Sequence, residues 1–521
     1  MQETGGREPH MVTQHTEGAF ATRAEAAWQR IFVVPFCFMG MGIFRVWTET
    51  LYANNQIGFP ALSVPFALPV PFVDGYSFFD FVSAGVLVLL AVFARRLAPL
   101  YRHPWVIVTC VACMVGSACV NFASLLAPEL AALLFWPSVV LGGVGIALIL
   151  MLWSEFYGCI NPLRVALYYS AGIAVSCLIL WAFKGLSLWW LFIGACLIPI
   201  VSLLCLWRSY ATLPRDSYPP AYQGDFSFPW KPVAVIGVYS FVYGLRGGVF
   251  AGPLAMNSGV GAFIGAVIVY ALVCRQVSRG ANAQAADGGE GEPAGAAFDF
   301  SLLYRIGIPL MFVSLVPLEG PLPWWGFVAD TCALASYTVL LILIMAILGN
   351  LSYRYGVCAL WIFAIERAVR LVTSQSGRIV GNAMQPLEAD PLANALLLAA
   401  MAGLLVVVAA LFLSEKSVSS SQWGVVLKPA TQGETREFEQ NRLAVKCHEL
   451  AHQAGLTARE EDILLLVAQG MTLGQISREL YIGSNTVKTH MKHLYQKLDV
   501  HSRDEVFALL GVKGETGQAG R

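Results

Sequence analysis

The pattern of apolar and polar residues divides the chain into three parts. Residues 1–30 are polar, residues 31–413 are almost continuously apolar, and the remainder is polar with short amphipathic stretches. A helix that crosses a bilayer needs about 20 apolar residues. By that length the apolar part predicts twelve spans, near residues 31–51, 77–94, 105–126, 131–153, 164–183, 189–207, 233–250, 258–274, 303–318, 324–349, 357–372 and 391–413.

Two polar segments interrupt the predicted spans. Ser209–Lys231 separates the first six spans from the last six, and Gln276–Ala297, rich in Ala, Gly and acidic residues, is typical of a disordered linker. Arg45 in the first span and Arg246 in the seventh lie at nearly the same depth, which suits an internal repeat. The predicted fold class is all-α, with about twelve transmembrane helices in two pseudo-repeats of six, followed by a small helical domain.

Four short amphipathic helices are predicted between Leu456 and Leu510. Three capping boxes start helices there: Thr457 with Glu460, Thr472 with Gln475, and Ser502 with Glu505. Gly470 and Gly511 stand where helix C-termini favour glycine. The apolar residues at helical spacing would close one small core, made of Ile463, Leu466, Val467, Leu473, Ile476, Leu480, Val487, Met491, Leu494 and Leu498.

Composition supports a membrane location for most of the chain. Of 521 residues, 57% are hydrophobic and 13% are charged, and the mean hydropathy is +0.63. A soluble globular domain carries about 25% charged residues. The net charge of zero adds nothing, because the charges are unevenly placed.

Lysine and arginine predict the orientation, since cytoplasmic loops carry an excess of both. Residues 52–76, 126–131 and 318–324 contain neither. The alternate loops hold Arg95, Arg96, Arg102, Arg164, Arg208, Arg215, Lys231, Arg275, Arg279 and Arg354. With twelve spans both termini lie in the cytoplasm, and we expect a multi-pass protein of the plasma (inner) membrane. Residues 1–30 show no cleavable apolar signal segment.

Charged residues inside the predicted spans have two interpretations. Charge within a bilayer is costly, so it usually faces a cavity or a partner. One interpretation is a polar vestibule, open to the exterior, that binds a small anionic ligand. The other is a set of structural ion pairs, with side chains that reach the outer interface. The residues that would bind the ligand, all placed in the outer halves of their spans, are Arg45, Glu49, Arg246, Asp330, Glu366 and Arg370.

The third of the C-terminal helices is basic on its outer face. Lys488, Lys492 and Lys497 project from it, and no acid stands between Glu479 and Asp499. A basic footprint confined to one helix suits a helix that lies in the major groove of DNA. The alternative is a four-helix interaction module with a solvated basic helix.

The whole segment resembles a LuxR-type helix-turn-helix DNA-binding domain. The matching residues are Leu456, Thr457, Arg459, Glu460, Gly470, Ile476, Leu480, Thr486, Val487, Lys488, His490, Lys497, Leu498 and Arg503. The resemblance implies that Leu473–Leu480 is the scaffold helix and Ser484–Leu498 the recognition helix. Lys488, Thr489 and Lys492 match the positions that usually meet DNA. The residues expected to bind DNA are Ser484, Asn485, Thr486, Lys488, Thr489, Lys492 and Lys497. Gly483 replaces the usual Ser N-cap, and glycine is an acceptable N-cap.

The loop between the second and third spans is similar to the basic loop of the major facilitator superfamily. It holds Arg95, Arg96, Tyr101 and Arg102, but lacks the Asp and Gly of that motif. The similarity bears on fold rather than on transport.

The segment between bundle and domain is polar. Residues 434–454 are predicted to be helical, either as a dimerising stalk or as an arm that packs on the DNA-binding domain. Cys447, His448 and His452 suggest a metal site, but a closed structural site needs four ligands and a fourth is missing, so no metal is expected. The expected domains are a tail (1–30), the membrane domain (31–413), a linker (414–451) and the DNA-binding domain (452–517).

No phosphate-binding loop and no convincing catalytic constellation is present, so we expect neither an enzyme nor a cofactor. The sequence predicts a membrane-tethered one-component transcriptional regulator that senses a small molecule. Its expected partners are double-stranded DNA, the lipid bilayer, the small molecule and a second copy through the C-terminal domain. The alternative is a secondary transporter of the major facilitator type with a fused DNA-binding regulatory domain.

Overall fold

The computed structural model describes most of the membrane part and of the C-terminal domain. The described residues are 36–53, 75–213, 230–250, 259–286, 301–316, 324–355, 357–385, 390–413, 443, 446–448, 450–480 and 482–510. The predicted N-terminal tail, most of the 52–76 and 209–231 loops, Gly511 and most of the 414–451 linker lie outside them.

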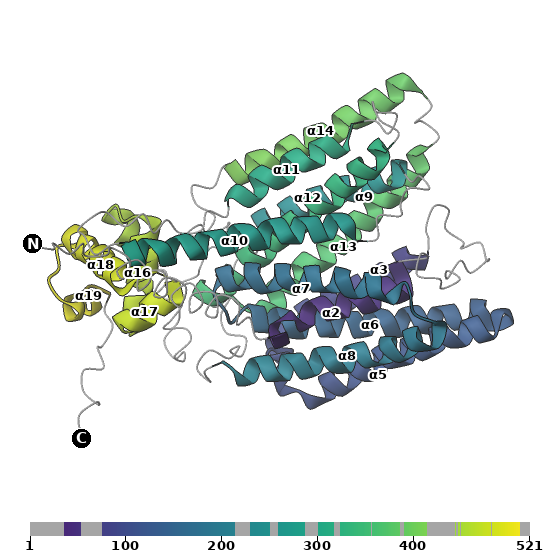
Figure 1. The fold of residues 1–521 in the computed structure, drawn as a ribbon, viewed down its shortest axis with the longest axis horizontal. Helices are drawn as coiled ribbons and strands as arrows, with labels where there is room; N and C mark the ends of the chain where they lie inside the picture. Colours follow the sequence, from purple (N-terminus) through teal and green to yellow (C-terminus); the bar gives the residue numbers. More distant parts are fainter. Residues whose placement is uncertain are drawn as a thin grey trace, which may run out of the picture.

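A helix lies at each of the twelve predicted positions (Figure 1). In chain order these are α2 (Gly40–Thr48, flanked by the short helices η1, Phe36–Met39, and η2, Glu49–Ala53), α3 (Gly75–Val92), α5 (Pro104–Leu126), α6 (Ala131–Tyr157), α7 (Pro162–Phe183), α8 (Leu188–Ala211), α9 (Trp230–Val249), α10 (Val260–Ala286), α11 (Ser301–Ser314), α12 (Trp325–Tyr355), α13 (Ala359–Met384) and α14 (Pro391–Leu413). Within the described residues, seven of these helices are long and apolar enough to cross a membrane, and three more contain shorter apolar helices. The protein is therefore an integral membrane protein.

The two sets of six helices pack in corresponding ways. In the first set α5 packs on α6 and α2 on α7; in the second set α11 packs on α12 and α9 on α13. The sets meet where α3 packs on α13 and α10 on α7. Each of these contacts thus has a counterpart at the same place in the order of the other set.

Small residues allow the closest helix contacts in both sets. Gly42 of α2 lies against the backbone of Gly172 in α7. Gly244 of α9 lies so near α13 that an added Cβ would stand 1.9 Å from the carbonyl oxygen of Ser374. Without a hydrophobic force between helices in lipid, such close backbone contact supplies much of their association.

Two expectations about the bundle are wrong. α10 continues to Ala286, so the first part of the predicted linker Gln276–Ala297 is helical, while its remainder lies outside the described residues. α13 continues to Met384 rather than ending near residue 372. Glu366 and Arg370 therefore lie in the half of α13 nearer the C-terminal domain, not in its outer half. The second half of α13 is polar, so the hydropathy pattern did not predict this extension.

The C-terminal domain is built from α16 (Ala458–Ala468), α17 (Leu473–Leu480), α18 (Ser484–Leu498) and α19 (Arg503–Leu510). The three predicted caps are confirmed. Thr457 and Glu460 form a reciprocal capping box, Thr472 and Gln475 exchange the same bonds, and the amide of Glu505 donates to Ser502 Oγ. Gly470 has φ +86°, a left-handed conformation that suits glycine at a helix end. All ten predicted core residues are buried or pack against the core.

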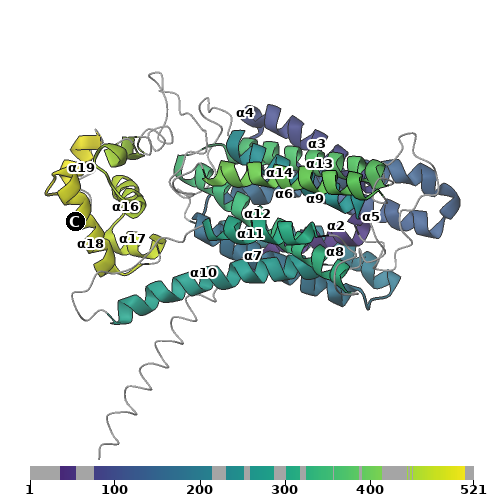
Figure 2. The same cartoon turned by 90° about the horizontal axis from the view of Figure 1, so that it is seen from above.

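The domain lies at one end of the bundle, and the last turns of α10 extend toward it (Figures 1 and 2). The described residues between bundle and domain favour an arm over a free stalk. Leu443 and Cys447 are buried with the domain core, and Leu450 packs against it. Lys446 Nζ donates to the carbonyl oxygen of Leu510 at 2.7 Å. Burial raises the pKa of the Cys447 thiol to about 12, and His448 Nδ1 lies 2.9 Å from Glu461 Oε1.

Candidate functional site

α18 presents one polar face and buries the other. It begins after its N-cap, Gly483, whose backbone is extended and which has no side chain that could cap the helix. Val487 and Leu494 are fully buried and fix the helix against α16 and α17. On the opposite face Ser484, Asn485, Lys488 and Lys492 are exposed.

The other three expected DNA-binding residues are placed differently. Thr486 is only 9% exposed, on the inner face. Thr489 is half-buried, and its hydroxyl donates to the carbonyl oxygen of Asn485 at 3.1 Å. Lys497 Nζ lies 2.7 Å from Glu460 Oε2 and donates to the carbonyl oxygen of Gly455. Its ammonium therefore does not project freely from the outer face, as the sequence pattern had suggested.

Three cations of the domain hold its helices together. Besides Lys497, Arg459 of α16 donates to the carbonyl oxygen of Leu480 at the end of α17, 2.9 Å away. Arg503 donates to the carbonyl oxygens of Val467 and Met471, which lie at and just beyond the end of α16. Hydrogen bonds to the last carbonyls satisfy groups that a helix end leaves unpaired.

Two titratable groups inside the domain are shifted by their surroundings. Burial opposes the charged form of Glu460, but hydrogen bonds from Lys497 and Thr457 outweigh it and hold the pKa of Glu460 below its ordinary value. Burial, and then the neighbouring Arg459 guanidinium, lower the pKa of His490. The Nε2 atom of His490 is buried, so this ring is turned inward, and its lowered pKa leaves it neutral at neutral pH.

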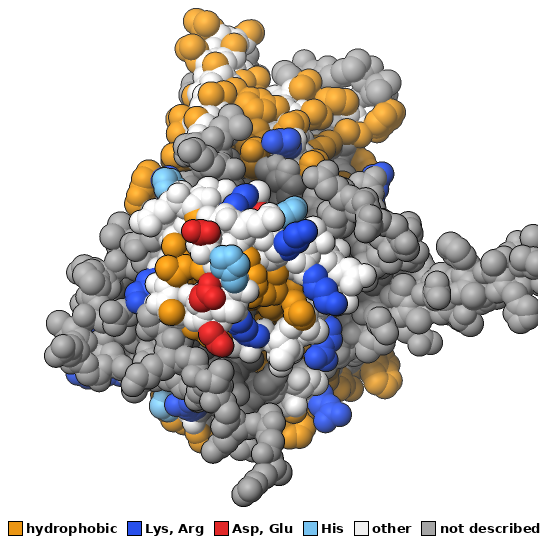
Figure 3. Space-filling view, turned by 90° about the vertical axis from the view of Figure 1, so that its left-hand side faces the viewer, with side chains coloured by type: hydrophobic (Ala, Val, Ile, Leu, Met, Phe, Trp, Pro, Cys, Tyr) orange, Lys and Arg blue, Asp and Glu red, His pale blue; other side chains and the backbone are white. Residues whose placement is uncertain are grey.

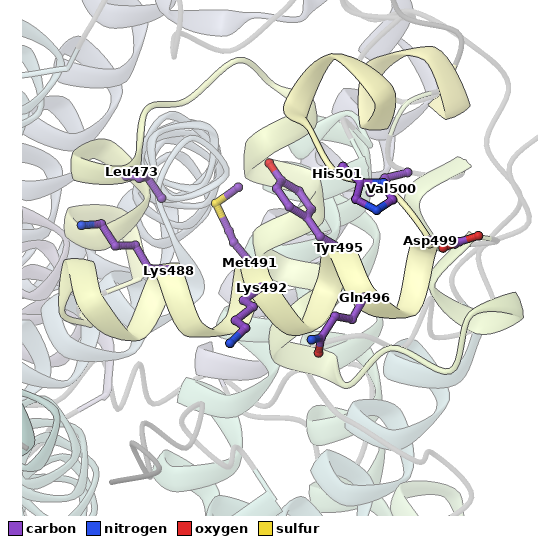
Figure 4. A pocket seen from close by; sticks show the side chains of 9 residues that line it. All are labelled: Leu473, Lys488, Met491, Lys492, Tyr495, Gln496, Asp499, Val500 and His501. Atoms are coloured by element: carbon purple, nitrogen blue, oxygen red, sulfur yellow. The ribbon is translucent and has the colours of Figure 1, made fainter. Parts of the chain in front are cut away.

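A groove of about 600 Å³ runs beside α18. Figure 4 shows Met491 and Tyr495 on one side of the helix and Lys492 and Gln496 pointing to the other. The remaining residues that line the groove are Leu473, Lys488, Asp499, Val500 and His501. Gln496 is not among the residues that the sequence predicts to bind DNA. It follows Lys488 and Lys492 at four-residue spacing, the interval that places side chains on one helix face.

Charge is divided across the exposed end of the domain. In the end-on view of Figure 3, Lys and Arg side chains follow one edge while the acidic side chains gather on the other side. A basic edge of this kind is the electrostatic footprint expected of a DNA-binding surface.

In the bundle, the six predicted ligand-binding residues form three ion pairs. Arg246 Nη1 lies 2.7 Å from Asp330 Oδ1, and its Nε donates to the carbonyl oxygen of Ser314. Its second terminal nitrogen is buried and has no hydrogen-bond partner among the described residues. A guanidinium group with one unmet donor can still bind an acceptor.

The other two pairs differ in strength. Arg45 Nε is 3.6 Å from Glu49 Oε1, and both side chains are partly exposed. Arg370 Nε donates to Glu366 at 3.1 Å and its Nη1 to the Tyr337 hydroxyl at 3.3 Å, with Glu366 fully buried. Tyr337 in turn stacks on Tyr243 of α9, with ring centroids 4.3 Å apart. We call the six charged residues with Tyr243 and Tyr337 the charge cluster.

Comparison with known proteins agrees with the geometry of the C-terminal domain. The model of the family described as "Bacterial regulatory proteins, luxR family" matches residues 454–510. These residues are a LuxR-type helix-turn-helix domain, as the sequence predicted.

Three curated proteins illustrate the match. The chain is 38% identical over 79 residues to a nitrate/nitrite response regulator protein homolog of Haemophilus influenzae, which covers 15% of this chain and 38% of that protein. It is 50% identical over 50 residues to the nitrate/nitrite response regulator NarL of Escherichia coli, 10% of this chain and 23% of that one. It is 46% identical over 56 residues to the transcriptional regulatory protein LiaR of Bacillus subtilis, 11% and 26%. The chain thus spans well under half the length of these relatives.

Two solved structures resemble the membrane part loosely. They are the human organic anion transporter MFSD10, at 14% identity, and the major facilitator transporter FucP in its outward conformation, at 15%. Each has a TM-score of 0.44 and covers 73% of this chain, with 98% and 99% of the respective transporter aligned.

Proposed function

We propose that this chain is a membrane-tethered one-component transcriptional regulator, in which a helical bundle senses a small molecule and a LuxR-type domain binds double-stranded DNA. The observation that carries the proposal is the exposed face of α18. Lys488 and Lys492 stand on the outer side of a helix whose inner side is buried, within residues that match the LuxR family. In helix-turn-helix domains the corresponding helix enters the major groove.

We further propose twelve spans in two sets of six, with both termini in the cytoplasm of a plasma (inner) membrane. Twelve helices at the predicted positions and the matching contacts in the two sets support this number. The arginines of alternate loops support the orientation. It would also place the DNA-binding domain on the side where DNA is.

The charge cluster is our candidate for the sensing site, with a small organic anion as the ligand. Two features support an anion. Within the described part of the chain Arg246 has one buried donor without a partner, and Arg45 Nε is as far as 3.6 Å from Glu49 Oε1. Arg246 lies on α9 and Arg45 on α2, the corresponding first helices of the two sets, so an anion between them would contact both halves.

We also propose that two copies bind one two-fold symmetric DNA site. Helix-turn-helix dimers read two half-sites about 34–36 Å apart. Footprinting of one asymmetric half-site would contradict a dimer.

The experiment uses full-length protein in lipid discs. Duplex DNA enriched from genomic fragments by this protein is tested for binding against a variant carrying Lys488→Ala and Lys492→Ala. Specific binding by the parent and its loss in the variant would support the regulator. Binding that the double substitution leaves unchanged would mean that α18 is not the DNA-binding helix.

Uptake separates this function from the transporter alternative. Accumulation of a radiolabelled organic anion in cells that express residues 1–433, without the DNA-binding domain, would favour a transporter with a fused regulatory domain. Binding of the anion without accumulation would favour a sensor.

A further inference from the structure

The DNA-binding domain contacts the bundle through Glu479, one residue before the end of α17. The Tyr353 hydroxyl donates to the Glu479 carboxylate at 2.7 Å. The Asn161 side-chain amide donates to the Glu479 backbone carbonyl at 3.3 Å. One residue of the scaffold helix therefore accepts two hydrogen bonds from the membrane domain.

The two donors belong to different halves of the bundle. Asn161 is the N-cap of α7, in the first set of helices, and Tyr353 lies in the last turn of α12, in the second. The halves pack tightly at this end. A Cβ added to Gly158, at the end of α6, would lie 2.7 Å from Ser352 Oγ and 2.8 Å from Ala359 Cβ. Glu479 thus spans a closed seam between the halves.

The helices that hold the donors also reach the charge cluster. α12 carries Asp330 and Tyr337 and continues without interruption to Tyr353. At 1.5 Å per residue, Asp330 and Tyr353 are ~35 Å apart along the helix. α7 packs on α2, which carries Arg45, and its Gly172 lies against the backbone of Gly42 in α2. A change that shifts α7 relative to α12 at the cluster would also move Asn161 relative to Tyr353.

From this geometry we propose that Asn161, Tyr353 and Glu479 form a clasp that holds the DNA-binding domain in a low-affinity position. Parting of the two halves at the seam releases it. The scaffold helix of a helix-turn-helix lies across the DNA backbone, so a domain fixed by α17 to its own bundle is restrained on a DNA-facing element. It is also restrained from moving to match a second copy at the half-site spacing. This proposal rests on the proposed function, because it describes the regulation of the same DNA-binding site.

The clasp would couple ligand binding in the bundle to DNA binding by the C-terminal domain. A ligand that binds the parted state better raises DNA affinity, and DNA raises ligand affinity by the same factor. A hydrogen bond to a charged group contributes about 1.5–3 kcal/mol, and 1.4 kcal/mol corresponds to a factor of ten. Loss of the Tyr353 hydrogen bond should therefore shift the clasped equilibrium by at least about tenfold.

The test uses full-length protein in lipid discs with two variants that each remove one donor. Tyr353→Phe removes only the hydroxyl. Asn161→Asp removes the amide donor. It keeps a side-chain oxygen in the place of Asn161 Oδ1, which accepts a hydrogen bond from the Leu163 backbone amide at 2.9 Å. Tyr101→Phe is the matched control, because it removes the hydroxyl of another tyrosine, one that accepts from Arg102.

Two measurements are made on each protein. Hydrogen–deuterium exchange over residues 157–165 and 473–482 reports the contact without any need for DNA. Affinity for the enriched duplex reports its consequence. We expect faster exchange in both segments in Tyr353→Phe and Asn161→Asp, and neither change in Tyr101→Phe. DNA binding should become about tenfold tighter in Tyr353→Phe, and tighter by a smaller factor in Asn161→Asp, whose amide donates to a neutral carbonyl.

The outcomes separate the clasp from the proposed function. Faster exchange with unchanged or weaker DNA binding would overturn the inhibitory role. Exchange that is identical to the parent in both variants would show that these bonds do not hold the domain. If the parent and every variant fail to bind any duplex, the proposed function fails, and the inhibitory role fails with it, whereas exchange would still report whether the contact exists.

Discussion

The ammonium group of Lys497 lies 2.7 Å from the carboxylate of Glu460, a buried side chain of the DNA-binding domain. The same carboxylate accepts from the backbone amide of Thr457 at 2.7 Å. One acid therefore joins the start of α16 to the last turn of α18. Lys497 thus helps to hold the domain together, whereas Lys488 and Lys492 are exposed and are the lysines of α18 that we propose for DNA binding.

The first prediction follows from that division. Lys497→Met should lower the free energy of unfolding of the domain by about 1 kcal/mol, since the buried Glu460 carboxylate loses its cation but Lys497 itself is partly solvated. Pulse proteolysis of the full chain in urea, scored on residues 458–510, would measure it. Lys488→Met is the matched control and should change stability little, because Lys488 is exposed. Unchanged stability in Lys497→Met would argue against a structural role for the pair.

The second prediction concerns DNA. If Lys488 and Lys492 each neutralise one phosphate, each substitution by Ala should reduce the slope of log affinity against log salt by about 0.9. If either lysine reads a base edge, discrimination at one position should fall by about 1–3 kcal/mol instead. Titrations of the enriched duplex at several salt concentrations distinguish the two. Neither effect in either variant would place the DNA on another face of the domain.

The domain could be predicted from its sequence almost completely, and the reason is local. Caps such as Thr457 with Glu460 and core positions such as Val487 and Leu494 are set by residues three or four apart. The Lys497 pair could not be predicted in this way, because its partner is 37 residues away in the chain. Helical spacing places Lys497 on a different helix face from Lys488 and Lys492, but it does not identify the acid that pairs with Lys497.

The bundle was predictable in its helices but less so in its polar contacts. Hydropathy located α12 well, whereas the Gln, Ser, Arg and Asn residues late in α13 ended the prediction too early. The pairing of Arg246 with Asp330 joins residues 84 positions apart, and the contact of Asn161 with Glu479 joins residues 318 apart. Such contacts depend on how helices are arranged, which periodicity does not specify.

The third prediction is a loss of domain stability in acid. An unfolded chain protonates His490 near pH 6.5, whereas the folded domain, in which burial and Arg459 lower the pKa of His490, does so only at lower pH. The unfolded state then binds more protons, so the free energy of unfolding falls as pH drops below about 6.5. Glu460 acts in the same direction lower down, because its pKa is held below its ordinary value, near 4.3 in an unfolded chain.

Pulse proteolysis between pH 5 and pH 7.5 would detect the upper part of this loss. His490→Gln should remove it, and His493→Gln, an exposed neighbour on the same helix, should not. A parent protein whose domain stability is flat across this range would contradict the inward placement of His490.

The fourth prediction tests whether the charge cluster senses or merely stabilises. Arg246→Met should destabilise the bundle by up to about 3 kcal/mol, the low end for a buried pair, since it leaves the partly exposed Asp330 carboxylate without its cation. Adding Asp330→Leu should restore most of that stability, because replacing both members of a buried pair with apolar residues is often close to neutral. Thermal unfolding of the full chain in detergent measures both effects.

The double variant then decides the role of the pair. If a small organic anion alters DNA affinity in the parent, the restored double variant should have lost that response. If the anion changes DNA affinity as much in the double variant as in the parent, the Arg246–Asp330 pair is structural. Arg45 would then be the remaining candidate for the anion-binding residue.

The last prediction addresses the seam that Glu479 spans. Gly158→Ala places a methyl group 2.7 Å from Ser352 Oγ and 2.8 Å from Ala359 Cβ, both in the second half of the bundle, so the halves must separate at this end. The backbone of Gly158 is helical and accepts alanine without strain.

We expect a loss of stability of about 1–3 kcal/mol from overpacking, together with tighter DNA binding as the clasp loosens. Gly85→Ala is the matched control, because a Cβ there has no neighbour within 4 Å in the part of the chain that the structure describes, and it should leave DNA affinity unchanged. Since Gly158→Ala and Tyr353→Phe would release the same contact, their effects on DNA affinity should fall short of additive. Additive effects, or weaker DNA binding in Gly158→Ala at full expression, would mean that the seam and the clasp are not connected.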